Sequence, residues 1–367
     1  MSTTSMSGSE QALLEAARGG DEDAFQRLVE PYRRELHAHC YRMMGSVQDA
    51  EDALQDSLLR AWRGLSGFEG RSSLRSWLYK IATNASLNAI ERRPKRVLPV
   101  DWDSSLDEYA LGLPPAEAAW VEPYPDEQNS LVEGYVSPDA RYELRESVEL
   151  AFVAALQHLP ANQRAALILR EVLGFSAREA AESLDTSVAS VNSALQRARA
   201  AVDERLPEQS QQETVRALGD ERLRELVESY SDAMMRGDVD AVVEMLAEDA
   251  AWSMPPLPAW FKGREALTDF LANGPLSGDW RWRHVPVWAN CQAARGVYAW
   301  YEPDRCYRPF ALEVLTLEGD KIKDVVSFIT RSDQSPDPDF YLRYPEQPQD
   351  EERFVAFQRF GLPERLD

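Results

Sequence analysis

A short stretch in the middle of the chain carries side chains suited to reading DNA. The run Gly174–Arg199 places one helix after Ser176, a turn at Asp185–Ser187, and a second helix whose apolar residues recur at helical spacing. This is the pattern of a helix-turn-helix. The second helix would expose short polar and basic groups that can approach base edges and phosphates in a major groove, namely Ser187, Ala189, Ser190, Asn192, Ser193, Gln196 and Arg197. Any helical hairpin buries such an apolar stripe, and a repressor would show the same motif, so the pattern alone leaves the function open.

A second group of side chains forms a basic segment inside an acidic chain. The chain has 40 Lys and Arg against 62 Asp and Glu, a formal net charge of −22, and such a charge opposes non-specific binding to a phosphate backbone. The basic segment has a single acid, Glu91, among its bases, which are Arg71, Arg75, Lys80, Arg92, Arg93, Lys95 and Arg96. The charge distribution therefore favours one local basic module over a chain that binds DNA along its whole surface.

Helices must position both groups of side chains. Helical periodicity runs through most of 11–93, stops over 94–138 and returns over 141–206. The interruption contains seven prolines and many acids, which is typical of a linker. From residue 221 onward the pattern changes to one helix followed by strand-like runs rich in Trp, Tyr and Val, as in an α+β domain. The chain is therefore predicted to have a disordered lead and helix start (1–19), a helical domain (20–93), an acidic linker (94–138), a second helical domain with the helix-turn-helix (139–206), a short linker (207–219), an α+β domain (220–331) and a C-terminal extension (332–367).

Length and composition exclude several other classes of protein. The 367 residues exceed what one ordinary core accommodates. No apolar stretch approaches the roughly 20 residues of a membrane-spanning helix, and the Ser- and Thr-rich N-terminus lacks the features of a signal peptide. We therefore expect a cytoplasmic protein that does not bind membranes. Cys40, Cys291 and Cys306 show no C-x-x-C spacing, and His37 and His39 do not share a helix face, so no disulfide, metal or other cofactor is expected.

Four blocks in the first helical domain resemble region 2 of sigma-70-type factors. They occur in the family's order and spacing, and are Asp49–Asp56 (DAEDALQD), Phe68, Ser73–Asn84 (SLRSWLYKIATN) and the pair Arg92–Arg93. The segment Arg164–Arg199 resembles region 4 of the same factors. Because regions 1 and 3 are absent, the chain is identified as a member of the extracytoplasmic-function group of sigma factors. The two regions cover roughly half of the chain.

This resemblance implies a promoter-recognition subunit whose partners are core RNA polymerase and promoter DNA, and which has no catalytic residue. Asp52, Gln55 and Asp56 would bind the clamp helices of the polymerase's largest subunit, because an acidic face suits a basic coiled coil. As an alternative, they are solvated charges on a surface helix. The melted minus-ten strand would be bound by Phe68, Arg71, Arg75, Trp77, Tyr79, Lys80, Asn84, Arg92 and Arg93.

The implied DNA contacts differ in kind between the two regions. In region 2, Phe68, Trp77 and Tyr79 would provide stacking surfaces while the basic residues contact phosphates, although Trp77 is equally well placed for the helix core. Region 4 would bind the minus-thirty-five element through Arg178, Ser187, Ala189, Ser190, Asn192, Ser193, Gln196 and Arg197. The family often has Lys or Arg where Asn192 and Ala194 stand, so weaker phosphate contact is expected here. The acidic linker resembles the connector that passes through the polymerase's RNA channel, and a solvated spacer explains its composition equally well.

The last domain, from Glu221 to about Thr330, resembles the SnoaL-like α+β cone. The resemblance rests on Asp238–Ala241, Leu246–Ala250, Ser253–Pro256 and Phe261–Leu267. Some members of that fold are cyclases or isomerases with an Asp or His base, and the polar candidates for such a role are Asp249, His284, Tyr298 and Asp304. The positions of Asp249 and His284 favour structural roles, so we expect no catalysis.

The expected fold is multidomain, with two all-α sigma domains (a region 2 helical bundle and a region 4 helix-turn-helix) followed by an α+β SnoaL-like cone. We expect the cone to regulate the sigma regions in cis, through a small-molecule ligand or an intramolecular contact. Two other classes of protein also accommodate these motifs. A ligand-responsive repressor would bind duplex DNA without polymerase, whereas a SnoaL-type enzyme with a DNA-binding appendage would lose turnover when Asp249 or His284 is replaced.

Overall fold

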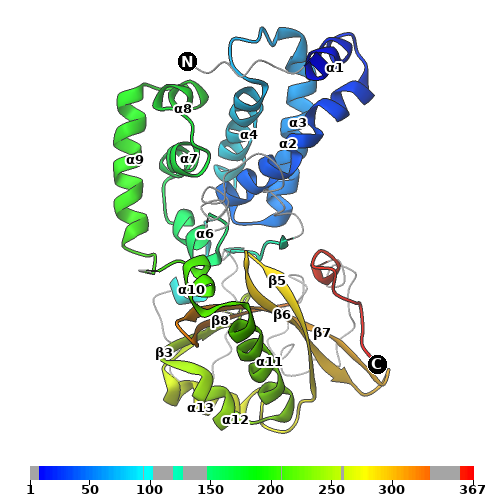
Figure 1. Ribbon diagram of the computed structural model, residues 1–367, viewed down its shortest axis with the longest axis vertical. Coiled ribbons are helices and arrows are strands. Elements are labelled where there is room, and N and C mark those ends of the chain that lie inside the picture. The colour runs from blue at the N-terminus through cyan, green and yellow to red at the C-terminus, as the bar shows by residue number, and fades with distance from the viewer. Residues whose placement is uncertain are drawn as a thin grey trace. The chain divides into compact units, whose positions relative to one another are not determined.

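The computed structural model divides the chain into two compact units (Figure 1). It describes residues 8–93, 95–101, 119–126, 147–207, 209–257, 260–330 and 356–367. The helical unit comprises residues 1–96 and 128–206, and the sheet unit comprises residues 97–127 and 207–367. Within the described residues, no helix is both long enough and apolar enough to cross a bilayer.

Helices α1 (Gly8–Arg18), α2 (Glu22–Met44), α3 (Val47–Gly64) and α4 (Leu74–Ile90) form the first half of the helical unit. Short polar residues start three of them, because their side-chain oxygens accept hydrogen bonds from otherwise unpaired backbone amides. Asp21 accepts from the amide of Ala24 at 3.0 Å, and Ser46 and Ser73 do the same for α3 and α4. The helices bury one apolar face each, which makes a bundle core.

The second half of the helical unit contains the helix-turn-helix. Helices α6 (Leu150–Gln157) and α7 (Ala161–Leu167), with a π-helical turn at Ile168–Val172, precede α8 (Ala177–Ser183) and α9 (Val188–Asp203). A capping box between Ser176 and Glu179 starts α8. The turn before α9 passes through Asp185, whose φ of 48° is one that Asp tolerates better than most residues. The sequence prediction of a helix-turn-helix is confirmed.

The two halves of the helical unit pack against each other. Helix α4 contacts α7 and α8, while α2 contacts α6 and α7, and Figure 1 shows α7 and α8 beside α4. At the end of α2, Gly45 adopts φ 68°, and a Cβ there would lie 3.0 Å from the side chain of Gln157. A glycine at this helix terminus therefore permits both the left-handed cap and the close approach of α6.

A six-stranded mixed sheet is the centre of the other unit. The strands are β3 (Leu246–Ser253), β4 (Trp260–Lys262), β5 (Trp282–Ala289), β6 (Gln292–Tyr301), β7 (Cys306–Glu318) and β8 (Lys321–Ile329). Their order is β4-β3-β8-β7-β6-β5, and β3 pairs with β8 in parallel while the other pairs are antiparallel. Helices α11 (Asp220–Arg236), α12 (Val239–Met245) and α13 (Arg264–Asn273) cover one face and share its core.

Two segments predicted as linkers contain ordered structure. Residues 207–219 include helix α10 (Gln211–Leu218), which packs on β7, and the Gln211 side chain bonds to both the amide and the carbonyl of Leu317. The segment 94–138 includes β1 (Arg96–Val97), a short 3-10 turn at Pro99–Asp101, and β2 (Ala119–Trp120). The segments predicted as linkers therefore carry short regular elements at these residues, and the rest of 94–138 lies largely outside the described residues.

Residues 119–126 attach to the edge of the six-stranded sheet. The amide of Tyr124 donates to the Asn290 side chain at 2.8 Å, and the Asn290 amide donates back to the Tyr124 carbonyl at 2.8 Å. The amide of Cys291 donates to the Asp126 carboxylate at 2.8 Å, and Pro125 forms a bridge to Ala289. Tyr124 is fully buried. This segment belongs to the sheet unit although it precedes α6 in sequence.

The last residues of the chain return to the same sheet. Phe357 and Leu362 are buried, and Phe357 lies edge-on to the Tyr298 ring with the ring centroids 5.2 Å apart. A Cβ at Gly296 would lie 2.7 Å from Leu362, so this strand position needs a residue without a side chain. Residues 356–367 of the predicted C-terminal extension therefore cover part of β6.

Candidate nucleic-acid interface

The residues predicted to bind polymerase form one exposed face of α3. Asp52, Gln55 and Asp56 are all exposed, while Ala53 and Leu54 between them are buried. The amphipathic spacing of α3 produces this division. The Asp56 carboxylate lies 2.7 Å from the guanidinium of Arg60 one turn away, an exposed pair that does not close the face.

Asp49 lies in the same sequence block but has a different role. It is buried, and its carboxylate pairs with the guanidinium groups of Arg93 and of Arg96, the latter at 2.7 Å. Arg93 also approaches Asp52 at 3.4 Å. Asp49 thus ties the start of α3 to the chain that leaves α4. The sequence predicts that Arg93 contacts DNA phosphates, and its local pattern does not indicate this pairing with Asp49.

Two of the three aromatic residues predicted to stack on bases are buried. The ring of Phe68 is 5 % exposed and lies 4.9 Å from the half-buried ring of Trp77, measured between centroids. Tyr79 is fully buried, and its hydroxyl donates to Glu35 at 3.1 Å. Protein atoms therefore cover Phe68 and Tyr79 as the chain is folded here, and neither ring can stack on a base in this arrangement. Trp77 packs on Phe68, in keeping with its alternative as a core residue.

The basic residues of this region fall into two groups. Arg71 and Arg92 are exposed. Asn84, the neutral residue predicted to bind the same strand, is half-buried on α4. Arg75 instead pairs with Glu35 at 3.3 Å and lies over the Tyr79 ring, 4.8 Å from its centroid. The pairing with Glu35 fixes the guanidinium at the surface between α2 and α4.

Lys80 is held by the helix-turn-helix. Its ammonium group lies 2.6 Å from the carboxylate of Asp185 in the turn and donates to the carbonyl of Glu182 at 2.7 Å. These partners follow it in sequence by more than 100 residues. The structure therefore brings a residue predicted to bind the minus-ten strand against the second predicted DNA-binding element.

The residues predicted to contact the minus-thirty-five element lie exposed on α8, on the turn and on α9. All of the following are exposed: Arg178, Ser187, Ala189, Ser190, Asn192, Ser193, Gln196 and Arg197. Val191, Leu195 and Ala198 on the opposite face of α9 are buried. The Ser187 side chain accepts from the amide of Ser190 at 3.1 Å and so starts α9. Arg178 pairs with Glu182 at 2.8 Å one turn along α8.

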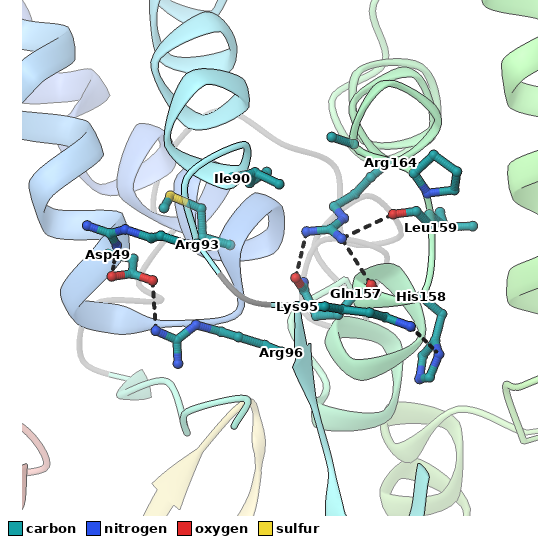
Figure 2. Close-up of a pocket in the computed structure, with 12 residues that line it drawn as sticks. Asp49, Ile90, Arg93, Lys95, Arg96, Gln157, His158, Leu159 and Arg164 are labelled. Carbon is teal, nitrogen blue, oxygen red and sulfur yellow. Dashed lines mark hydrogen bonds and ion pairs between the residues drawn. The ribbon is translucent and has the colours of Figure 1, made fainter. Parts of the chain in front are cut away.

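A buried polar seam joins the two halves of the helical unit, and the sequence analysis did not identify it. Arg164 on α7 donates to the carbonyl of Met43 at the end of α2, to the Gln157 side chain at 2.6 Å, and to the carbonyls of Gln157 and Leu159 (Figure 2). Gln157 in turn donates to the carbonyl of Arg42 at 3.1 Å. Burial lowers the pKa of Arg164 to about 10. The only sequence signal for this seam is the position of Arg164, one turn after Pro160, where α7 begins.

The sheet unit buries a polar network among its apolar residues. Arg295 on β6 is fully buried and pairs with Glu313 on β7, whose other oxygen accepts from Ser327 at 3.0 Å. Trp252 donates to Ser327 at 3.0 Å. His284 lies 3.1 Å from Arg295, and its pKa is lowered well below the usual value by burial and by that guanidinium.

The four polar candidates for catalysis in the cone are dispersed. Asp249 is exposed and pairs with Lys323 at 2.5 Å, and Asp304 pairs with Arg308 in a turn. Tyr298 donates to the carbonyl of Pro363 at 2.8 Å. Because Tyr298 and His284 occupy adjacent register positions, they point to opposite faces of the sheet. The structure does not assemble these residues into one site. Among the described residues, no cluster of three or more His, Cys, Asp or Glu could hold a metal ion.

Comparison with known protein families matches three parts of the chain. The Sigma-70 region 2 family matches residues 28–96, the Sigma-70 region 4 family matches residues 149–202, and the SnoaL-like domain family matches residues 227–325. The first two matches lie in the helical unit and the third in the sheet unit. They confirm the predicted fold class.

Individual relatives extend these matches to most of the chain. The ECF RNA polymerase sigma factor SigG of Mycobacterium tuberculosis is 40 % identical over 359 residues, which are 95 % of this chain and 86 % of the relative. The RNA polymerase sigma-H factor of Pseudomonas aeruginosa is 32 % identical over 54 % of this chain and 93 % of its own. The crystal structure of the Mycobacterium tuberculosis extracytoplasmic function sigma factor SigJ superimposes with a TM-score of 0.51 at 21 % identity, covering 84 % of this chain and 95 % of that one, and so shows the same fold. This chain belongs to the extracytoplasmic-function family of RNA polymerase sigma factors, with a SnoaL-like domain after its two sigma regions.

Proposed function

We propose that this sigma factor directs core RNA polymerase to its promoters by binding minus-ten DNA with region 2 and minus-thirty-five DNA with region 4. The observation that carries the proposal is the exposed face of α9, which presents short polar side chains and Arg197. An α-helix is narrow enough to enter a major groove with such a face toward the bases. The exposed acidic face of α3 would bind the polymerase, because an acidic surface is attracted to a basic partner.

The region 4 contact can be tested by replacing Arg197 with alanine. We expect this variant to weaken promoter binding by the holoenzyme by about 1–3 kcal/mol if Arg197 contacts a base, and by less if it contacts a phosphate. Arg205 is a matched control, because it is also an exposed arginine but lies after the end of α9. Run-off transcription from a promoter with and without its upstream element is the measurement. Equal losses for Arg197→Ala and Arg205→Ala would contradict the proposed docking of α9.

Region 2 would have to release several contacts before it binds the minus-ten strand. Lys80 is held by Asp185 and by the carbonyl of Glu182, while Phe68 and Tyr79 are covered. We propose that the packed helical unit is the resting form of the free protein, in which the helix-turn-helix covers one side of α4. Binding to polymerase would then separate the two regions and expose Lys80. Any ligand that binds only the separated form shifts the equilibrium in that direction.

We also propose that the SnoaL-like domain regulates the sigma regions in cis. The support is the attachment of Tyr124 and Asp126 to Asn290 and Cys291, because these linker residues lie in sequence between region 2 and region 4. Anchoring the linker shortens the free chain on both sides of it and so limits how far the two regions can separate. The domain itself is proposed to catalyse nothing, since its polar candidates are dispersed.

The anchoring can be tested without deleting the domain. Asn290→Gly removes the acceptor for the Tyr124 amide, and glycine tolerates the φ of 55° found at this position. Asn273→Gly, at the exposed end of α13, is the matched control. We expect Asn290→Gly and a truncation after Gln212 to change promoter output in the same direction. If both leave transcription and polymerase affinity at the level of the control, regulation in cis is refuted.

A further inference from the structure

Val188 is an exposed apolar side chain at the start of the second helix of the helix-turn-helix. It is the first residue of α9, directly after the cap residue Ser187, and it is 42 % exposed. Val191 and Leu195 follow it at helical spacing and are buried. Within residues 174–199, all of which the structure describes, no other Val, Leu, Ile or Phe side chain is exposed. The apolar stripe of α9 therefore continues beyond its buried part.

The position of Val188 is what suggests a role for it. A single exposed valine on an ordinary surface needs no explanation, because folded proteins expose many apolar groups. In a helix-turn-helix, however, the residues at the start of the second helix contact base edges in the major groove. Figure 1 shows α9 at the edge of the helical unit, with α7 and α8 along one side of it. The exposed Asn192 lies next to Val188 on the helix surface, since residues four apart are neighbours.

The polar side chains of the first turn of α9 are already engaged with each other. The Ser187 hydroxyl accepts from the amide of Ser190 at 3.1 Å and lies 2.9 Å from the Ser190 hydroxyl. These bonds start the helix and reduce what the two serines can offer to a base. Val188 and Ala189 lie between them, are both exposed and have no polar side-chain atom. The first turn therefore presents mainly methyl groups to its surroundings.

Only one feature of a base edge in the major groove suits such a side chain. The other features are hydrogen-bond donors and acceptors, whereas thymine alone has a methyl group, on its C5 atom. A valine against a donor or acceptor would displace water without replacing its hydrogen bond, which is unfavourable. Contact between Val188 and a thymine methyl removes apolar surface of both partners from water, which is favourable.

We propose that Val188 selects a thymine in the minus-thirty-five element through contact between its side-chain methyl groups and the C5 methyl of that base. The inference rests on the proposed docking of α9 in the major groove, and it names a base which that docking requires. Burial of one methyl-sized group corresponds to roughly a fourfold gain in affinity. The preference is therefore modest at this position and adds to the hydrogen bonds made by the polar residues of α9.

Replacing thymine with uracil tests this contact alone, because uracil has the same hydrogen-bonding edge and lacks only the methyl. Holoenzyme assembled from core polymerase and the full chain first selects sequences from promoter duplexes that are randomised over the upstream element. Each thymine of the selected element is then replaced with uracil, one at a time, and the dissociation constants are compared. We expect one position at which uracil weakens binding roughly fourfold. In Val188→Ser, the thymine and uracil duplexes should bind equally at that position.

Val100→Ser is the matched control for this substitution. Val100 is 40 % exposed, almost as much as Val188, but it belongs to the sheet unit. This variant should retain the full difference between the thymine and uracil duplexes. Val188→Thr keeps one of the two methyl groups and should retain part of the difference. Circular dichroism melts establish that each variant is folded, which is expected because both valines are exposed.

Three results would overturn the proposal. The first is a selected upstream element in which no thymine can be distinguished from uracil. The second is a difference between the two duplexes that is as large in Val188→Ser as in the unchanged protein, because another residue would then contact the methyl. The third is loss of the difference in Val100→Ser as well. Selection of no upstream sequence at all would refute the docking of α9 itself, and this inference with it.

Discussion

Arg164 should contribute more than the Lys80–Asp185 ion pair to holding region 4 against region 2. Arg164 is 5 % exposed, and one of its four hydrogen bonds crosses to the carbonyl of Met43 in region 2. The Lys80 and Asp185 side chains are 38 % and 72 % exposed. Arg164→Met removes the buried bond while keeping an apolar chain of similar length. Asp185→Asn removes the exposed charge and keeps a residue that tolerates the left-handed turn.

The two substitutions differ in expected magnitude. A hydrogen bond to a charged group contributes about 1.5–3 kcal/mol, so Arg164→Met should shift the ratio of packed to separated molecules by roughly 10- to 150-fold, at about 1.4 kcal/mol per tenfold. An exposed ion pair contributes about 0.2–1 kcal/mol, so Asp185→Asn should shift the same ratio by less than roughly sixfold. The other contact of Lys80, to the backbone carbonyl of Glu182, is retained in Asp185→Asn.

Energy transfer between two dyes on the free protein measures this ratio. Glu15 and Asp203 are exposed and lie in different regions, so cysteines introduced there can carry the dyes. The native cysteines Cys40, Cys291 and Cys306 are buried and should not react. Circular dichroism melts of each variant separate opening from unfolding, because three of the Arg164 bonds lie within region 4. A larger shift in Asp185→Asn than in Arg164→Met, with both variants folded, would refute this reasoning.

Three further predictions concern stability and pH. Glu313→Gln leaves the buried guanidinium of Arg295 without its carboxylate and should lower the free energy of unfolding of the sheet unit by about 3–5 kcal/mol in a urea titration; a loss below 1 kcal/mol would argue against a charged pair. Burial raises the pKa of Asp324 from 3.8 to about 6. The folded protein therefore loses stability relative to the unfolded chain as the pH rises from 3.8 to 6. Asp324→Asn should therefore stabilise the protein by about 3 kcal/mol at pH 8 and not at pH 4, and equal effects at both pH values would contradict that cause. Burial lowers the pKa of His39, which lies 2.9 Å from Thr83, to about 3. The unfolded chain takes up this proton near pH 6.5, so stability should fall by about 1.4 kcal/mol per unit as the pH drops from 6 to 4, and thermal melts of His39→Gln should show a smaller slope.

The sequence predicted those features that depend on residues close together in the chain. The helix start after Ser176 and the buried stripe of α9 each involve residues within one or two turns. The exposed polar face of α3 follows from the same periodicity. The helical periodicity predicted over most of 11–93 agrees with α4, which ends at Ile90.

Contacts between distant residues could not be predicted in this way. The pairing of Lys80 with Asp185 and the bond from Arg164 to Met43 span more than 100 residues and depend on how two helical halves pack. The burial of Tyr79 has the same origin, because Glu35 on α2 accepts its hydroxyl. A composition rich in proline and acids also gave no sign that Tyr124 completes the edge of a sheet formed more than 100 residues later. Local patterns determine which residues face outward, but not what covers them.

Run-off transcription with purified core RNA polymerase tests the assignment most directly. Core enzyme supplied with the full chain should form a stable complex and produce discrete transcripts from cognate promoters, and reversing the charge of Asp52 and Asp56 on α3 should reduce both. A chain that fails to associate with core polymerase, with and without the SnoaL-like domain, would contradict its role as a sigma factor.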